Sequence, residues 1–297
     1  QLQSVAASVV VGSSIMDEVI RVTIEKLESV AVTPFKYLSP ILGIIIKKNA
    51  PSADKSYLNT LQAQAKEYNV QTKVAECGNP QDVAQAIQWW RTNPNISGII
   101  ILSDFDQASR ALYNMIPARL DIDGLSAYSL GKLCGNPSPI AYRHAPCTPV
   151  ACLKILQTLF PQGMVGKKAA VIGRSIRVGR PLVEILNQQN ATVTLYHSKS
   201  VYPENKFVDY DIIISAIGKG KFLDCSKVEP TNKVLIDVGT NVIDHKLYGD
   251  FDYDNMANKA KYITPVPGGV GNMTTAVLFA KLFANKYSLT EGENIWQ

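Results

Sequence analysis

The fold prediction starts from the segment Lys168–Lys199, which reads KAAVIGRSIRVGRPLVEILNQQNATVTLYHSK. The apolar run Ala169–Ile172 stops at Gly173, as a buried parallel strand does. A loop then leads into a helix that carries Pro181 in its first turn, where a missing N–H costs nothing, and that ends near Asn190. The β-branched run ATVTLYH follows as a second strand. The stretch predicts a βαβ unit, and because the helix N-terminus favours a phosphate we expect a dinucleotide ligand.

The loop glycines, Gly173 and Gly179, do not have the usual GxGxxG spacing, so a purely structural turn stays open as an alternative. An NAD-binding unit places Asp or Glu at the end of its second strand to hold the ribose hydroxyls. That place reads YHSK here, without an acid. We expect Arg174, Ser198 and Lys199 to approach a 2′-phosphate, which favours NADP over NAD. The alternative is that Lys199 is only a solvated charge at the strand end.

Composition bounds the class of protein. With 297 residues, 46% hydrophobic and 19% charged, the chain is an ordinary globular protein, long enough for two domains. Its net charge of +5 is spread without a basic run, which gives nucleic-acid binding no support but suits an anionic cofactor and substrate. No apolar run approaches the roughly 20 residues of a membrane helix, so we expect no membrane partner.

The five cysteines form no CxxC pair and have no histidine cluster beside them, so we expect a reducing compartment and no metal. The chain begins at Gln1 without methionine. We therefore expect a cytoplasmic protein and leave open an organelle that is reached through a removed targeting segment.

Other segments alternate between strand and helix patterns. We predict strands at Leu42–Ile46, Gln71–Ala75, Gly98–Leu102, Asp211–Ile217 and Lys233–Val238, and helices from Ser14 to before Pro34 and at Ser56–Tyr68, Pro80–Arg91, Pro149–Phe160 and Thr274–Phe283. A loop-rich region from Leu133 to Pro149 marks a boundary. We therefore predict an α/β fold of two parallel-sheet domains, the second Rossmann-like. The first covers 1–148, with a C-terminal helix at 273–287 that packs back onto it, and the second covers 149–272.

Six segments, in order, resemble the methylenetetrahydrofolate dehydrogenase/methenyltetrahydrofolate cyclohydrolase family: LDIDGL (120–125), PCTP (146–149), GRSIRVGRP (173–181), HSKS (197–200), IDVGTN (236–241) and ITPVPGGVGNMT (263–274). The resemblance implies two α/β domains flanking a cleft, with a tetrahydrofolate derivative on the first and NADP on the second. It also implies a homodimer.

Site residues follow from the same resemblance. It implies that Asp123 holds the polar edge of the pterin ring, a task that suits a carboxylate because it accepts two parallel N–H bonds. Without the family, Asp123 reads as a turn residue. The other expected folate contacts are Tyr57, Leu61, Ile101, Leu102, Ser103, Pro267, Gly268 and Gly269, with Asn272 replacing a proline. The expected cofactor contacts are Gly173, Arg174, Ser175, Val178, Gly179, His197, Ser198, Gly218, Gly239 and Thr240.

The catalytic motif departs from the family pattern, which is a tyrosine followed four residues later by a lysine. Tyr57 fits, but the lysine is Leu61, and the glutamine that would bond the lysine is Leu102. Lys55 and Lys66 fall on the far side of the helix at about 100° per residue. Gln64 shares the face of Tyr57, but an amide is no general base.

We therefore expect an NADP-dependent methylenetetrahydrofolate dehydrogenase whose cyclohydrolase step is lost or weakened. Hydride transfer needs chiefly positioning, whereas hydrolysis needs an acid and a base. The alternatives left open are a full bifunctional enzyme and a non-catalytic homologue that binds folate and NADP. Another Rossmann-type dehydrogenase is a third reading, which the DIDG and PGGVG segments disfavour.

Overall fold

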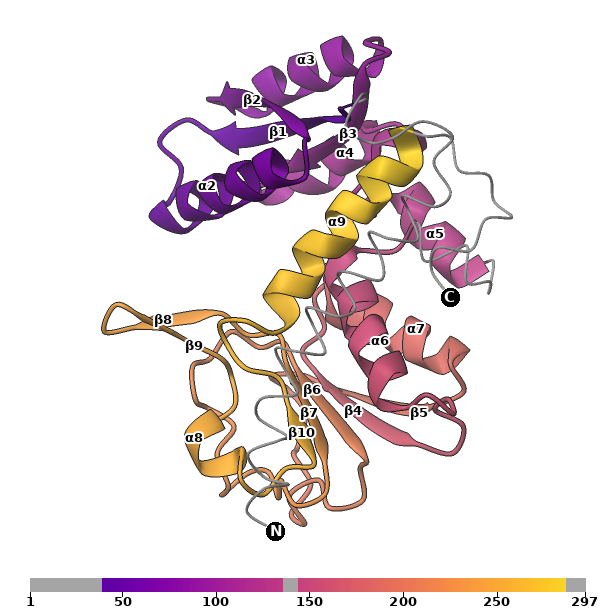
Figure 1. The fold of residues 1–297 in the computed structure, drawn as a ribbon, viewed down its shortest axis with the longest axis vertical. Helices are drawn as coiled ribbons and strands as arrows, with labels where there is room; N and C mark the ends of the chain where they lie inside the picture. The colour runs from indigo at the N-terminus through magenta and orange to yellow at the C-terminus, as the bar shows by residue number, and fades with distance from the viewer. Residues whose placement is uncertain (1–38, 136–143, 287–297) are drawn as a thin grey trace. The chain divides into compact units, whose positions relative to one another are not determined.

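The computed structural model describes residues 39–135 and 144–286, which divide into two compact units (Figure 1). We call residues 39–135, 144–147 and 277–286 the three-stranded unit and residues 148–276 the five-stranded unit. The helix predicted between Ser14 and Pro34 lies outside the described residues. The predicted α/β class with parallel sheets is confirmed.

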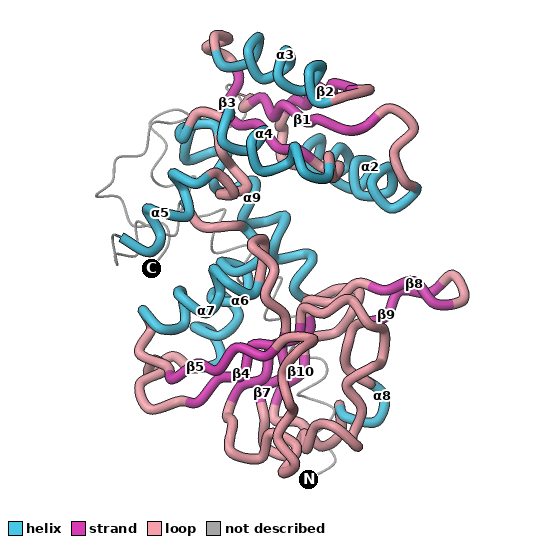
Figure 2. The backbone as a smooth tube through the Cα atoms, turned by 180° about the vertical axis from the view of Figure 1, so that it is seen from behind, coloured by secondary structure: helices cyan, strands magenta, loops and turns pink. Residues whose placement is uncertain are grey.

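The three-stranded unit is built on a parallel sheet of order β2-β1-β3, with β1 at Ile41–Lys47, β2 at Gln71–Cys77 and β3 at Ile96–Ile101. Helices α2 (Ser52–Glu67) and α3 (Pro80–Arg91) cover opposite faces of this sheet (Figures 1 and 2). The core between the sheet and α3 also takes in α4 (Ser109–Met115). Two short 3₁₀ turns, Asp106–Ala108 and Ala118–Leu120, and α5 (Ala127–Gly135) follow.

Local sequence explains where these helices begin. Asn79 accepts a hydrogen bond from the Asp82 N–H at 2.9 Å, and Pro80 takes the first helical position, so α3 has the predicted bounds. The other helix, α2, starts at Ser52, four residues before the predicted Ser56. Pro51 stands at its N-cap position without a side-chain hydrogen bond, and its carbonyl accepts the Lys55 N–H at 3.2 Å. The stretch left between the predicted strand, which ends at Ile46, and the predicted helix is therefore partly helical.

The five-stranded unit is built on a parallel sheet of order β10-β7-β6-β4-β5. Its strands are β4 (Lys168–Ile172), β5 (Thr192–Tyr196), β6 (Ile212–Ser215), β7 (Val234–Asp237) and β10 (Tyr262–Ile263). Helix α7 (Gly179–Gln188) is the crossover between β4 and β5, and α6 (Cys147–Leu159) precedes β4. Because β5 and β6 flank β4, the connections that leave β4 and β6 diverge, which creates a crevice at the carboxyl ends of these strands.

Several elements differ from the prediction. Helix α5 extends into the region predicted as loop from Leu133, and α6 begins at Cys147. Helix α9 (Val270–Lys286) starts four residues before Thr274. The prediction also missed a hairpin of β8 (Asn241–Ile243) and β9 (Lys246–Tyr248) and the short α8 (Tyr253–Met256). These pieces are too short to carry a hydrophobic period.

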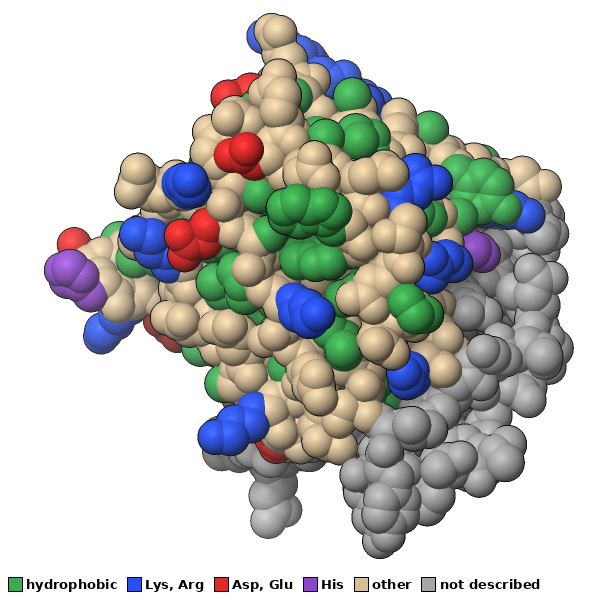
Figure 3. All heavy atoms as spheres, turned by 90° about the horizontal axis from the view of Figure 1, so that it is seen from above, with side chains coloured by type: hydrophobic (Ala, Val, Ile, Leu, Met, Phe, Trp, Pro, Cys, Tyr) green, Lys and Arg blue, Asp and Glu red, His purple; other side chains and the backbone are tan. Residues whose placement is uncertain are grey.

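The last ten described residues of α9 belong to the three-stranded unit. The buried Lys281 donates hydrogen bonds to the carbonyls of Ile122, at 3.2 Å, and Ala145. Asn285 Nδ2 donates to the carbonyls of Ser97, at 3.1 Å, and Arg119, at 2.6 Å. In the described part of the chain, no helix is both long and apolar enough to cross a membrane. On the face seen in Figure 3, Lys and Arg side chains are scattered among neutral ones.

Candidate active site

The loop after β4 is shaped by its two glycines. Gly173 has φ 118°, and a Cβ there would overlap the carbonyl oxygen of Ala216 at the end of β6. A Cβ on Gly179 would overlap the carbonyl oxygen of Gly173. Both positions therefore require glycine, because other parts of the backbone occupy the space that a side chain would need. The two glycines thus have the structural role in the turn that the sequence left open as an alternative. The same packing holds the loop at the crevice between β4 and β6.

Side chains of the loop are also tied internally. Ser175 Oγ accepts the Val178 N–H at 3.1 Å, and the Arg180 N–H donates to the Ser175 carbonyl at 3.1 Å. After β5, the His197 N–H donates to Ser200 Oγ at 2.9 Å, and the Lys199 N–H donates to His197 Nδ1 at 3.2 Å. His197 therefore carries its ring proton on Nε2 when neutral.

A cavity of about 450 Å³ lies at this crevice. It is lined by Gly173, Arg174, His197, Ser198, Ser200, Tyr202, Ala216, Ile217, Lys219 and Phe222. Two of these residues, Arg174 and Lys219, are cationic. Burial raises the pKa of Tyr202, and the nearby Asp250 carboxylate raises it further. A polar hollow with two cations, beside a helix N-terminus, has the chemistry that a phosphorylated ligand needs.

Four predicted cofactor residues line this cavity, namely Gly173, Arg174, His197 and Ser198. The others, Ser175, Val178, Gly179, Gly218, Gly239 and Thr240, are not among its lining residues. Sequence reasoning missed the other six lining residues, Ser200, Tyr202, Ala216, Ile217, Lys219 and Phe222. The signal for Lys219 was present, because it follows Gly218 at the end of an apolar run that was read as a strand.

The loop after β7 is organised by buried carboxylates. Asp237 Oδ1 accepts the N–H groups of Gly239 at 3.1 Å and Asp250 at 2.9 Å, and Oδ2 accepts that of Phe251 at 3.0 Å. Burial raises the pKa of Asp237 to about 7, and the Asp250 charge adds to this effect while the N–H donors oppose it.

The equivalent strand ends of the three-stranded unit carry a polar relay. The Lys47 N–H at the end of β1 donates to Ser103 Oγ at 2.9 Å, and Ser103 Oγ donates to Asp54 Oδ2 at 3.0 Å. Ser103 is buried, and Asp54 lies in the first turn of α2. This relay anchors the start of α2 to the switch point between β1 and β3. Sequence reasoning did not single out Asp54.

The residues predicted for catalysis differ in exposure. Tyr57 is 37% exposed on α2, whereas the side chain of Leu61 is 0% exposed and belongs to the core. Leu102 is half-buried after β3, and its N–H donates to the Ile45 carbonyl at 2.9 Å. Within the part of the chain that the structure describes, no donor reaches the buried Oε1 of Gln64. Tyr57 is therefore the more exposed of these two α2 side chains, and the role of both in folate binding stays a prediction.

Asp123 lies in a tightly held turn. The neighbouring Asp121 accepts the N–H groups of Gly124 at 3.1 Å and Ser126 at 3.0 Å. Gly124 has φ 66°, and a Cβ there would overlap the carbonyl of His144. Asp123 itself is half-buried, while Asp121 is buried and committed to the turn. Asp123 is therefore the more exposed acid of this turn, and its role in folate binding stays a prediction.

Of the other predicted folate residues, Ile101 is buried at the end of β3. Pro267, Gly268 and Gly269 lie in the five-stranded unit, just before α9. Their role, and the cleft expected between two domains, stay predictions. Among the described residues, no group of three or more His, Cys, Asp or Glu side chains is arranged to hold a metal ion.

Known proteins share both the sequence and the fold. The model of the tetrahydrofolate dehydrogenase/cyclohydrolase NAD(P)-binding domain matches residues 146–288. The bifunctional protein FolD of Coprothermobacter proteolyticus is 38% identical over 253 residues, which cover 84% of this chain and 90% of that protein. The chain belongs to the tetrahydrofolate dehydrogenase/cyclohydrolase family. The resemblance drawn from the six sequence segments is thereby confirmed.

Two solved structures show that the similarity to this family extends from the sequence to the three-dimensional fold. The bifunctional FolD of Campylobacter jejuni has a TM-score of 0.79 at 25% identity, over 95% of this chain and 98% of that chain. A methylenetetrahydrofolate dehydrogenase of the silkworm Bombyx mori has a TM-score of 0.77 at 27% identity, over 93% and 96%. The residues matched by the NAD(P)-binding domain of the family, 146–288, include the whole described five-stranded unit.

Proposed function

We propose that this chain oxidises methylenetetrahydrofolate to methenyltetrahydrofolate with NADP, and that its cyclohydrolase step is lost or strongly weakened. The observation that carries the dehydrogenase half is the cavity at the end of β4 and β6, which brings together Arg174, Ser198 and Lys219. No acid follows β5 to hold unphosphorylated ribose hydroxyls. The cationic and hydroxyl side chains favour a 2′-phosphate.

In this proposal the five-stranded unit binds the dinucleotide, and the three-stranded unit binds the folate through Asp123 and Tyr57. NADP supplies the chemistry when bound, because its nicotinamide ring accepts the hydride. The protein contributes orientation. Asp123 accepts N–H groups of the pterin ring, and Tyr57, exposed on α2, borders the one-carbon bridge.

The loss of hydrolysis rests on the family's catalytic position. Hydrolysis of the methenyl group needs a base to deprotonate water, typically worth about 10²–10⁴ in rate. Leu61 stands where the family pattern has the lysine, and its buried side chain has no group that moves a proton. The half-buried Leu102 likewise replaces the glutamine.

The test is an assay of the purified full chain that follows NADPH formation from methylenetetrahydrofolate, with the loss of methenyl absorbance recorded separately. We expect NADPH to form and methenyltetrahydrofolate to decay at its uncatalysed rate. If neither reaction is accelerated while both ligands bind, the chain is a non-catalytic homologue.

A second candidate, the full bifunctional enzyme, is favoured by one observation, since relatives such as that of Coprothermobacter proteolyticus are named as bifunctional. Accelerated decay of methenyltetrahydrofolate in the same assay would decide for it. We also infer a homodimer from the family resemblance, and light scattering at a known concentration measures its mass.

A further inference from the structure

The carboxylate of Asp250 is fully buried and surrounded by donors. Its Oδ2 accepts the Ser215 hydroxyl at 2.9 Å and the N–H groups of Ile217 at 2.8 Å and Gly218 at 3.4 Å. Its Oδ1 accepts the Lys219 N–H at 3.0 Å and Asn241 Nδ2 at 3.1 Å. Hydrogen bonds from several donors are what makes a buried carboxylate tolerable.

Three of these donors belong to one short segment, the loop after β6. Successive N–H groups that point at one acceptor fix the backbone of that loop, because each would lose its partner if the loop moved. Ile217 and Lys219 also line the cavity described above. Asp250 itself does not line the cavity. It therefore holds the wall of the cavity from behind.

The loop after β7 is fitted to the same carboxylate. A Cβ on Gly239 would overlap Asp250 Oδ1, so only glycine lets this backbone pass. On the other side, a Cβ on Gly249 would overlap Asp237 Oδ2. The Asp250 N–H donates to Asp237 Oδ1 at 2.9 Å, which joins the two carboxylates into one network. Two loops at the carboxyl ends of neighbouring strands thus share one buried anchor.

We propose that Asp250 is a positioning residue for the dinucleotide, acting through the loop Ile217–Lys219 that it holds against the cavity. The inference rests on the proposed NADP site and adds a residue that touches no ligand. Without the carboxylate, three N–H groups lose their acceptor and the Lys219 backbone is no longer fixed. The cavity then binds a phosphate group less tightly, because the Lys219 ammonium is no longer held in place beside it.

The test measures NADP and folate affinities of the full chain by calorimetry. The variant Asp250→Asn keeps the shape but puts an amide NH₂ against N–H donors, so we expect the Kd for NADP to rise at least tenfold. The Kd for folate should stay within twofold. Ser215→Ala removes one donor that lies in the core and not in the cavity, so we expect a rise of at least threefold. In the Asp250→Asn background, Ser215→Ala should add nothing further.

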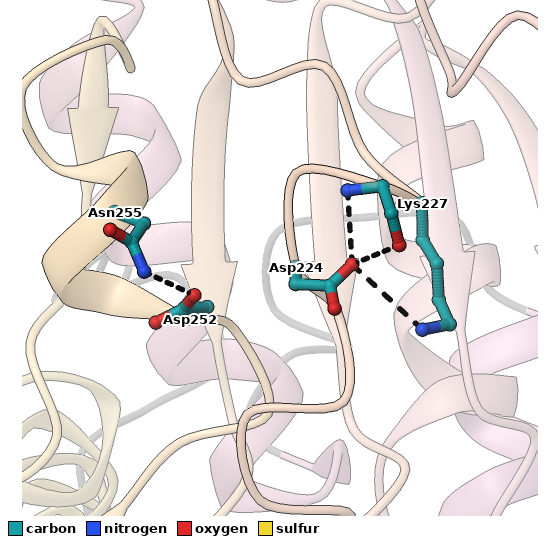
Figure 4. A network of polar contacts seen from close by, with 5 residues as sticks. Asp224, Lys227, Asp252 and Asn255 are labelled. Atoms are coloured by element: carbon teal, nitrogen blue, oxygen red, sulfur yellow. Dashed lines mark hydrogen bonds and ion pairs between the residues drawn. The ribbon is translucent and has the colours of Figure 1, made fainter.

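The matched control is Asp252→Asn, which removes the same charge two residues away. The Asp252 carboxylate accepts a hydrogen bond from Asn255 Nδ2 at 2.7 Å at the start of α8. Figure 4 draws this pair together with a second turn, at Asp224. We expect this variant to bind NADP as the unmodified protein does.

An unchanged Kd for NADP in Asp250→Asn, or in Ser215→Ala if Asp250→Asn does not fold, would overturn the proposal. A fall in melting temperature with equal losses of folate and NADP affinity would also overturn it, because that is the mark of a merely structural residue. If the unmodified protein does not bind NADP at all, the proposed function fails instead.

Discussion

Restoring the lysine and glutamine of the family pattern separates the two activities. Leu61 is fully buried, so Leu61→Lys alone gives up the burial of a leucine, about 1.5–3 kcal/mol, and places an ammonium among apolar groups. An unpartnered buried charge costs several kcal/mol more, relieved in part by a depressed lysine pKa. We expect this single variant to be less stable by at least about 3–5 kcal/mol, with little hydrolase activity.

Leu102→Gln supplies the missing acceptor at a half-buried position after β3. A hydrogen bond to a charged group contributes about 1.5–3 kcal/mol. The double variant should therefore be more stable than the sum of the two single changes predicts, by about that amount. With base and partner both present, its cyclohydrolase rate should rise at least about 10²-fold, the low end for general acid–base catalysis.

Loss of methenyl absorbance measures the rate, and urea denaturation of all four proteins measures the coupling. Asn59→Lys is the control, since it adds the same charge to an exposed position on the far side of α2, two residues from both Tyr57 and Leu61. It should leave hydrolysis unchanged. If the unmodified protein already hydrolyses methenyltetrahydrofolate at a rate that the double variant does not improve, the base lies elsewhere and the placing of Leu61 is wrong.

Three further predictions concern cofactor choice, folate binding and pH. The kcat/KM of the unmodified protein should be more than tenfold higher with NADP than with NAD. Ser198 lines the cavity, so Ser198→Asp should reduce this preference at least tenfold, because its carboxylate repels the 2′-phosphate. Equal use of both cofactors by the unmodified protein would contradict the assignment. Asp123→Ala should weaken folate binding by about 2–5 kcal/mol in calorimetry with the fold intact, and an unchanged affinity would make Asp123 only a turn residue. Burial raises the pKa of Asp237 from 3.8 to about 7, so the folded state holds this proton more tightly than the unfolded chain does. Its contribution to stability is thus full below pH about 4 and is lost as pH rises through about 7, at up to about 1.4 kcal/mol per pH unit. Denaturation at pH 5 and pH 7 should show this slope in the unmodified protein and a flatter one in Asp237→Asn, and equal slopes would contradict it.

The sequence predicts the strands well where apolar runs are bounded by glycine or proline. The runs at β4, β6 and β7 end at or near Gly173, Gly218 and Gly239, so local chemistry alone locates them. Helix α3 has both a cap and a proline at its start, and its bounds were predicted without error. Short elements such as the β8–β9 hairpin carry too few residues for a period to emerge.

The sequence predicted cavity residues in the loops that directly follow β4 and β5. It missed residues that reach the cavity only because β6 pairs with β4 in the sheet. Gly173 and Ala216 are far apart in sequence, and only the pairing of β4 with β6 brings them into contact. Lys219 enters the cavity for the same reason. The complete burial of Leu61 could not be predicted. The helical period shows which face of the helix a residue lies on, but not which other parts of the protein cover that face.

The contacts of α9 fix an order of events during synthesis. Lys281 and Asn285 bond to carbonyls of residues as early as Ser97, so the unit that begins first along the chain is completed by residues that are made last. Among the described residues, the five-stranded unit is one continuous stretch, residues 148–276, and needs no such wait. On a ribosome, where earlier domains ordinarily fold first, the candidate folate unit therefore finishes after the candidate dinucleotide unit. A released chain that ends at Ala276 should therefore keep the strands of the five-stranded unit but lack the hydrogen bonds of Lys281 to the carbonyls of Ile122 and Ala145.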